Sequence, residues 1–537
     1  MRSICLYFQV HQPYRLRTYR FFNIGDDHYY YDEYQNRSIV RRIAEKCYLP
    51  ANKMMMGLIR EYGTAFKISY SISGTALEQF QQYAPEVIQS FKELAKTGCV
   101  EFLAEPYAHS LASLSNKEEF ANQVKFHSDT IEHYFGQKPK TFRNTELIYS
   151  DHIGEMITDM GYTTMITEGA KHILGWKSPN YMYCSLSNPK LKILLRNFRL
   201  SDDISFRFSN HSWSQWPLTT EKFVGWLNKI EPQEEVVNIF LDYETIGERQ
   251  WKETGIFEFF KALPKTIFSK SDYIFNTPSE LSDILQPVAP IHVMHPISWA
   301  DEERDLTSWL GNELQDEAFA KLNSVQDKMN KCQDTELLHD WRLLQTTDHF
   351  YYMCTKWFSD GTVHKYFNPY GSPYEAFINY MNVLSDFILR VEKDATRPLL
   401  KQVTRKLKAK EPVRKNRKSI EKNKLSDQKQ AVKNPIKAKE NKTTHVVTGN
   451  FKSLNFDSII DLSDRKIKEM IKKVDIETLS YAAKGANQAV REKIEKNLGK
   501  LALKKYHEML DQVKSIKASD VAKYRKKIEQ EIKSILK

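Results

Sequence analysis

The chain has 537 residues, and its 79 Lys and Arg against 68 Asp and Glu give a net charge of +11. With 41% hydrophobic and 27% charged residues, the composition is that of a soluble globular protein long enough for two to four domains. These values exclude a disordered, collagenous or disulfide-stapled chain, and no apolar run reaches the roughly 18–20 residues of a membrane span.

The start, MRSICLYFQVHQP, holds a short apolar run that breaks at His11-Gln12-Pro13 without a small-residue cleavage site. We therefore expect a β-strand here and not a signal peptide. The six cysteines lie far apart and include no CxxC, which predicts free thiols in a reducing cytoplasm. Because His11, His109 and His292 lack the close spacing of a metal site, we expect neither a metal nor a cofactor.

Seven short apolar or β-branched runs alternate with helical stretches over residues 1–295. Strands that alternate with helices predict a parallel sheet with right-handed crossovers, and seven such units favour an α/β barrel, an incomplete (β/α)7 TIM-like barrel, over an open sheet. The expected strands are Ile4–Val10, Lys67–Ser73, Val100–Ala104, Thr141–Thr145, Thr163–Thr167, Leu191–Arg196 and Val236–Leu241.

The charge and the periodicity both change along the rest of the chain. Residues 296–395 have apolar positions at three- and four-residue spacing, which predicts a helical bundle packed on the barrel. Residues 401–537 hold 37 Lys and Arg against 17 Asp and Glu, a net of +20, and the remainder has a net of −9. We expect a disordered, Lys- and Arg-rich linker over 396–450 and a small all-α module over 451–537.

The basic linker has a second interpretation, because Lys and Arg runs bind phosphate backbones. No aromatic residues are interleaved for stacking on bases, so a solvated spacer is favoured and no specific nucleic acid is expected. Loose contact with acidic membranes or RNA stays open.

Polar side chains that suit catalysis follow four of the expected strands. Reactive groups of barrels gather at the carboxyl ends of the strands, so we expect these side chains on one rim. They are His11-Gln12, Glu105 with His109, Glu146, and Asp242 with Glu244.

Two carboxylates from different strands suit cleavage of a glycosidic bond with retention, which needs a nucleophile and a general acid about 5–5.5 Å apart. Glu146 suits the nucleophile because Arg143 and Asn144 could stabilise its charge. Asp242 suits the general acid because it ends a run of buried apolar residues, and Glu244 could contact substrate or tune Asp242.

Each of these residues also has an ordinary structural interpretation. His11 and His109 could be hydrogen-bonded core histidines, and Glu105 could cap the turn before Pro106. Trp216 and Trp251 could stack on sugar or pack in the core. Trp299 and Asp301 could contact substrate, or Asp301 could begin a helix, where acidic side chains are favoured.

The first ~390 residues resemble glycoside hydrolase family 57, through FQVHQP, GCVEFLAEPYAHS, FRNTELIYS, NIFLDYETIGERQ and HPISWADEERDLTSWLGNELQ, in this order. The last block and LSDDISFRFS are most similar to the α-amylase-like members. The resemblance implies an incomplete (β/α)7 barrel with a helical bundle, a nucleophile at Glu146 and an acid/base at Asp242. It also implies that His11 and nearby aromatic and acidic side chains contact an α-glucan or maltooligosaccharide. The block at Phe142-Arg143 departs from the family, which often has Trp there, and this puts substrate preference in doubt.

Residues ~452–535 resemble the helical middle and C-terminal region of the flagellar motor-switch protein FliG, with the KGA…VREKI…N core between Lys484 and Asn497. This resemblance implies a module that docks a protein partner.

The main hypothesis is a cytoplasmic, retaining glycosidase of carbohydrate metabolism that acts on the α-1,4 linkages of a polysaccharide, as α-amylases do. Transfer to another sugar, as in 4-α-glucanotransferases and branching enzymes, is the alternative. A second alternative is a non-catalytic glucan-binding scaffold that acts through its C-terminal module.

Overall fold

The computed structural model describes residues 2–356, 368–408 and most of 456–536, with gaps at 457–458, 460–461, 463, 484–485, 487, 499–501, 504–505, 508 and 511–517. The chain divides into two compact units, Met1–Lys415 and Asn416–Lys537. In the described part of the chain we find no helix with the length and apolar character needed to cross a bilayer.

The first sheet is built around β1 (Arg2–Val10), which is buried along almost its whole length. It pairs in parallel with β2 (Ile68–Ile72) and β8 (Val236–Asp242), while β3 (Val100–Phe102) continues the sheet beyond β2 and β9 (Tyr273–Phe275) pairs with the start of β1. The near-continuous apolar runs follow from burial on both faces, which is the rule for parallel sheets covered by helices.

The second sheet has the order β10-β6-β7-β5-β4. Parallel pairing joins β4 (Thr141–Arg143), β5 (Thr164–Glu168) and β7 (Lys192–Arg196). The short strand β6 (Met182–Ser185) runs antiparallel to β7 and pairs in parallel with β10 (Pro290–Ile291).

Two junctions bend these sheets into an incomplete barrel. Ala104, just after β3, bridges to Phe142 of β4 in parallel. On the other side the Asn197 amide donates to the carbonyl of Asn238, and the Asn238 side-chain amide donates to the carbonyl of Leu195. The strands around this ring are β1, β2, β3, β4, β5, β7 and β8, which coincide with the seven predicted runs; β6, β9 and β10 were not predicted.

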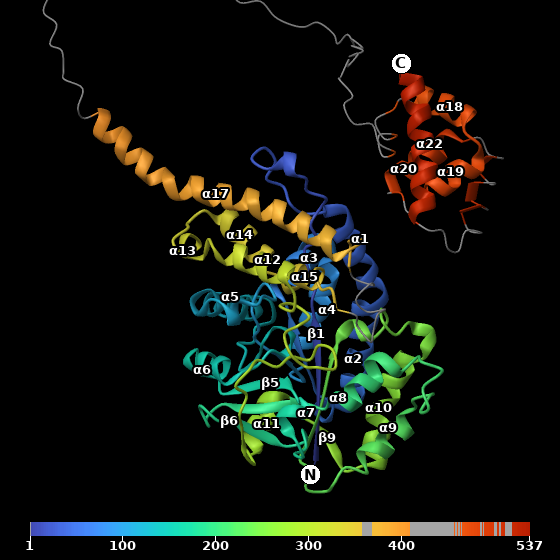
Figure 1. Ribbon diagram of the computed structural model, residues 1–537. Helices are drawn as coiled ribbons and strands as arrows, with labels where there is room; N and C mark the ends of the chain where they lie inside the picture. Colours follow the sequence, from blue (N-terminus) through green and yellow to red (C-terminus); the bar gives the residue numbers. More distant parts are fainter. Residues whose placement is uncertain are drawn as a thin grey trace, which may run out of the picture. The chain divides into compact units, whose positions relative to one another are not determined.

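Helices cover the outside of the barrel (Figure 1). In α5 the sequence sets both ends, since the Asn116 side chain accepts hydrogen bonds from the first-turn amides and Gly136 takes a left-handed φ of 69° after the last turn. The helices are α1 (Glu33–Ile43), α2 (Leu49–Tyr62), α3 (Gly74–Tyr83), α4 (Pro85–Ala95), α5 (Lys117–Phe135), α6 (Asp151–Asp159), α7 (Lys171–Leu174), α8 (Phe198–Asp202), α9 (Thr220–Leu227), α10 (Ile256–Lys270) and α11 (Pro278–Ile284).

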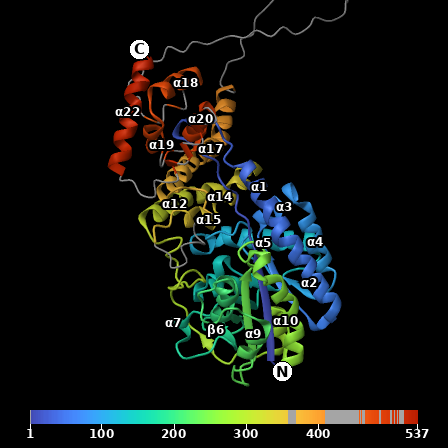
Figure 2. The ribbon, with the colours of Figure 1, turned by 90° about the vertical axis from the view of Figure 1, so that its right-hand side faces the viewer.

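A helical region lies at the end of the barrel where β1 finishes, as Figures 1 and 2 both show. It holds α12 (Glu313–Asn323), α13 (Gln326–Met329), α14 (Thr335–Leu344), α15 (Thr347–Tyr351) and α17 (Pro373–Lys408). The Thr347 amide donates to the carbonyl of His109, and Ser110 bridges to Thr346, so this region is joined directly to the rim of the barrel.

The long helix α17 continues to Lys408, past the boundary at 395 where the sequence predicted the linker to begin. Residues 373–408 contain no glycine and two prolines, Pro373 at the first helical position and Pro398, and the helix continues through the point where the charge pattern changes. The rest of the predicted linker, 409–450, lies outside the described residues.

The second unit is helical, as predicted for the C-terminal module. Its helices are α18 (Asp464–Lys473), α19 (Ile476–Ala483), α20 (Gln488–Asn497) and α22 (Ala518–Leu536). They bury one shared apolar core, which includes Ile467, Met470, Leu479, Val490 and Ile528.

Candidate active site

A cavity of about 1020 Å³ opens at the rim where β1, β4 and β8 end. Eight of the residues that the sequence predicted for the site line it, and they come from strand ends and from the segment after β10. These residues are His11, Gln12, His109, Glu146, Asp242, Glu244, Trp299 and Asp301.

Glu146 lies in a tight turn, Thr145–Leu147, directly after β4. Its backbone is left-handed, with φ 53° and ψ 25°, and Leu147 follows with φ 54°. Such angles are uncommon for residues with a side chain and are tolerated where surrounding contacts enforce them. Here the buried Asn144 side chain donates to the carbonyl of Ile148 and to the Ser113 hydroxyl and so closes the turn.

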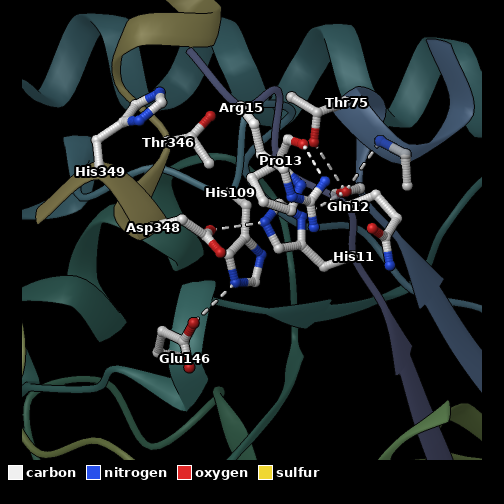
Figure 3. A network of polar contacts seen from close by, with 12 residues as sticks. His11, Gln12, Pro13, Arg15, Thr75, His109, Glu146, Thr346, Asp348 and His349 are labelled. Carbon is white, nitrogen blue, oxygen red and sulfur yellow. Dashed lines mark hydrogen bonds and ion pairs between the residues drawn. The ribbon is translucent and has the colours of Figure 1, made fainter. Parts of the chain in front are cut away.

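Both oxygens of the Glu146 carboxylate accept hydrogen bonds, and Figure 3 shows the one from His109. Oε1 lies 3.1 Å from His109 Nε2, and Oε2 accepts from the indole Nε1 of Trp299 at 2.5 Å. Burial acts to raise the pKa of Glu146, but the hydrogen bond and charge of His109 outweigh it and lower this pKa below its usual value. Glu146 is therefore ionised at neutral pH.

His109 is buried and links two carboxylates, with Nδ1 3.1 Å from Glu105 Oε2 and Nε2 facing Glu146. Burial acts to lower its pKa, yet the two carboxylate contacts raise the pKa of His109 to about 9. Burial would raise the pKa of Glu105, but His109 and Arg143 lower it to about 2. At neutral pH His109 is thus an imidazolium that donates a hydrogen bond to each carboxylate.

His11 stacks on His109, with ring centroids 4.0 Å apart and planes at 17°. Its Nδ1 lies 2.8 Å from Ser73 Oγ and its Nε2 lies 2.9 Å from Asp348 Oδ2. Burial and the adjacent charge of His109 lower the pKa of His11. Since both ring nitrogens already have protein partners, a hydrogen bond from His11 to a substrate would require one of them to be released.

Asp242 ends β8 and forms an ion pair with Arg249, whose Nη1 lies 2.7 Å from Asp242 Oδ2. The buried Glu244 accepts hydrogen bonds from the Tyr48 hydroxyl and, at 3.4 Å, from Gln12 Nε2. Burial, followed by the nearby charge of Asp242, raises the pKa of Glu244 to about 7. The side chains of Glu146 and Asp242 are each 20% exposed, so both reach the cavity.

Two guanidinium groups lie close to the Trp299 ring, with Arg143 Cζ 5.3 Å and Arg196 Cζ 5.6 Å from its centroid. Asp301 forms an ion pair with Lys356 at 3.2 Å and has a left-handed φ of 56°. The alternative that Asp301 begins a helix is therefore wrong, since the next helix, α12, begins at Glu313.

Comparison with known proteins decides the family. The model of glycosyl hydrolase family 57 matches residues 5–293, and that of the FliG C-terminal domain matches residues 450–536. A Methanocaldococcus jannaschii protein named "Putative alpha-amylase" is 43% identical over 393 residues, which cover 71% of this chain and 83% of that protein. The chain belongs to glycosyl hydrolase family 57. It is an α-glucan-active enzyme of the glycoside hydrolase and transglycosylase class.

A solved structure shares the fold of this family 57 enzyme. The branching enzyme TK1436 of Thermococcus kodakaraensis matches with a TM-score of 0.56 and 13% identity, over 74% of this chain and 91% of that one. The 4-alpha-glucanotransferase of Thermococcus litoralis matches with a TM-score of 0.48 and 15% identity, over 65% of this chain and 56% of that one. This chain thus spans little more than half of the glucanotransferase.

Two predicted contacts of the family 57 site are not brought into the cavity. Trp216 is 41% exposed and stacks on His211, and Trp251 is 60% exposed; neither lines the cavity. Neither packs in the core, which was the alternative interpretation. A role for them in binding sugar stays a prediction.

Several residues of the family 57 cavity were missed by the sequence reasoning. Asp348 and Tyr351 come from α15, which lies inside the stretch 296–395 that the sequence predicted only as a helical bundle. The chain leaves the helical conformation between Leu344 and Thr347, and the Gln345-Thr346-Thr347 run was the available signal. Arg249 and Phe206 were missed because they lie in a loop and in a short π-helix, Asp203–Arg207, that periodicity does not reveal.

Proposed function

We propose that the chain cleaves α-1,4-linked glucans with retention, through a covalent glycosyl-enzyme on Glu146 and with Asp242 as acid and then base. One observation carries this proposal: a carboxylate kept ionised by His109 and Trp299 shares a cavity with a second carboxylic side chain from another strand. This is the pair of groups that retaining cleavage needs.

In the first step an oxygen of Glu146 attacks the anomeric carbon while Asp242 gives its proton to the departing glycosidic oxygen. Arg249, which forms an ion pair with Asp242, also lines the cavity and lies beside the site of proton transfer. The charged His109 orients the attacking carboxylate. His109 and Trp299 together aim the Glu146 side chain, which limits the conformational entropy lost on the way to the transition state.

In the second step Asp242 removes a proton from the acceptor, whose oxygen attacks the anomeric carbon and releases Glu146. Water as acceptor gives hydrolysis, and a sugar hydroxyl gives transfer. The name of the M. jannaschii relative favours an α-amylase-like reaction, and transfer or branching is the alternative on the same site.

The experiment is to incubate the protein with maltooligosaccharides of one length and to follow the chain lengths of the products. Shorter products alone would support hydrolysis, and a ladder that includes longer products would support transfer. The Glu146→Gln variant keeps the size of the side chain and removes the nucleophile. It should lose nearly all turnover while it folds and binds glucan; wild-type turnover in this variant would refute the role of Glu146.

We also propose that residues 450–536 dock a protein partner, which the match to the FliG C-terminal domain supports. A cytoplasmic location is proposed on the six free thiols, five of them buried. Pull-down with the full chain and with a chain that ends at Lys415 tests the docking role, since loss of a captured protein should follow loss of the module.

A further inference from the structure

Phe206 presents an aromatic ring to the cavity from an unusual piece of backbone. The helix α8 ends at Asp202, and a π-helix continues it from Asp203 to Arg207. The extra residue in such a turn rotates the side chains that follow, and π-helices are frequent at functional sites. Phe206 lines the cavity and is 38% exposed, whereas Phe208, two residues on, is buried against Phe259.

One side chain connects Phe206 to the proposed acid. The guanidinium of Arg249 lies over the Phe206 ring, 5.9 Å from its centroid, and the same guanidinium pairs with Asp242 at 2.7 Å. The nucleophile Glu146 is held instead by His109 and Trp299. Phe206 is therefore associated with Asp242 and not with the groups that orient Glu146.

The side of the cavity next to the acid is the side of the leaving group, because the acid gives its proton to the oxygen of the sugar that departs. The same place receives the acceptor in the second step. An exposed aromatic ring with polar neighbours is the usual lining of a ligand site, and the C–H face of a glucose ring can lie flat on it. The polar neighbours in the cavity include Asp202, Arg207 and Asn210.

We propose that Phe206 is a specificity-determining residue, the aromatic platform for the glucose unit on the leaving-group and acceptor side of the cleaved bond. The inference rests on the proposed function and goes beyond it, because it assigns the acceptor side to a residue. A glucose on Phe206 competes with Arg249 for the ring and weakens its ion pair with Asp242.

The test compares two donors in Phe206→Ala. Cleavage of maltohexaose places a glucose unit on the leaving-group side. In α-maltosyl fluoride the leaving group is a fluoride ion, so its cleavage needs neither a sugar on that side nor a proton from Asp242. We expect kcat/KM for maltohexaose to fall about tenfold more than kcat/KM for the fluoride. Transfer from the fluoride to added maltose should fall relative to hydrolysis, and Phe206→Tyr, which keeps the ring, should restore both.

Phe22→Ala is the matched control, because it removes an 86% exposed phenyl ring that does not line the cavity. If Phe206→Ala unfolds, Phe206→Leu replaces it in the test, because leucine removes the aromatic ring but keeps an apolar side chain of similar size. Equal losses on the two donors, or no loss on either, would overturn the role of Phe206 while the function stands. A wild-type protein inactive on both donors would overturn the proposed function and this inference with it.

Discussion

His109 and Glu146 meet across two neighbouring strand ends, with the imidazole Nε2 3.1 Å from the carboxylate Oε1. Both residues have left-handed backbone angles, φ 52° and φ 53°. Two uncommon conformations in one contact indicate that the fold stabilises this pair at some cost in backbone strain. The pair links the buried Glu105 to the cavity, so the charge state of His109 controls that of Glu146.

Replacing His109 should change the pH dependence of catalysis. The groups that face His109 are Glu105, Glu146, Arg143 and His11. In the wild type the pKa of Glu146 is lowered, and His109 is charged until its pKa of about 9. In His109→Gln the cation is absent, so the pKa of Glu146 rises and more of it is protonated at acidic pH.

The measurement is kcat/KM on maltohexaose from pH 4 to 10. The acidic limb should move to higher pH in His109→Gln, because the lost cation no longer lowers the pKa of Glu146. His152→Gln, at an exposed site on α6, is the control. An acidic limb that stays in place would show that His109 does not set the ionisation of Glu146.

Asp242→Asn should separate the two halves of the reaction. Loss of general acid catalysis should lower turnover of maltohexaose by about 10²–10⁴-fold. Formation of the glycosyl-enzyme from α-maltosyl fluoride needs no acid, so a burst of fluoride should survive, followed by slow release of sugar. Stopped-flow detection of fluoride checks this; a burst lost as completely as steady-state turnover would mean that Asp242 is not the acid.

Glu244 makes stability depend on pH. Its pKa is raised to about 7 by burial and by Asp242, so its protonated form fits the folded state and its ionised form does not. The wild type should therefore lose stability as pH rises from about 4.5 through 7. Glu244→Gln removes this loss, which is about 3 kcal/mol by pH 8.

Urea unfolding at pH 5 and pH 8 measures the effect of Glu244. The difference in unfolding free energy between the two pH values should be smaller in Glu244→Gln than in the wild type. Glu45→Gln, at an exposed position, should match the wild type. Equal pH dependence in all three proteins would contradict the assignment.

Removing the second unit should not slow catalysis on small sugars. Cavity-lining residues all lie before residue 353, and the first unit extends to Lys415. A chain that ends at Lys415 keeps the whole of α17 and should turn over maltohexaose at the rate of the full chain. A large loss of kcat in this folded chain would contradict the separation of the two roles.

The strands could be predicted because burial on both faces leaves continuous apolar runs, as in Val236–Leu241. Polar residues directly after such runs, such as Glu146 and Asp242, could then be placed on one rim. Asp348 and Phe206 could not be placed in this way. Their positions depend on a helix break and on a π-turn, which arise from tertiary packing and leave no periodic signal.

The exposed tryptophans show the opposite limit. Trp216 and Trp251 were chosen by residue type, because aromatic rings bind sugars, yet the cavity receives Trp299 and Phe206 instead. The residue type indicates which ligands a side chain could bind, but not whether the side chain reaches the cavity. Only the backbone path decides which aromatic ring reaches the cavity.

The most direct test of the account is to trap the covalent intermediate. A 5-fluoro-α-glucosyl fluoride forms the glycosyl-enzyme quickly and slows its breakdown, so digestion and mass spectrometry can locate the attached sugar. The account predicts one adduct, on the peptide that contains Glu146, and its absence in Glu146→Gln. An adduct on Asp242, or active enzyme that turns the reagent over with inversion and without any adduct, would contradict it.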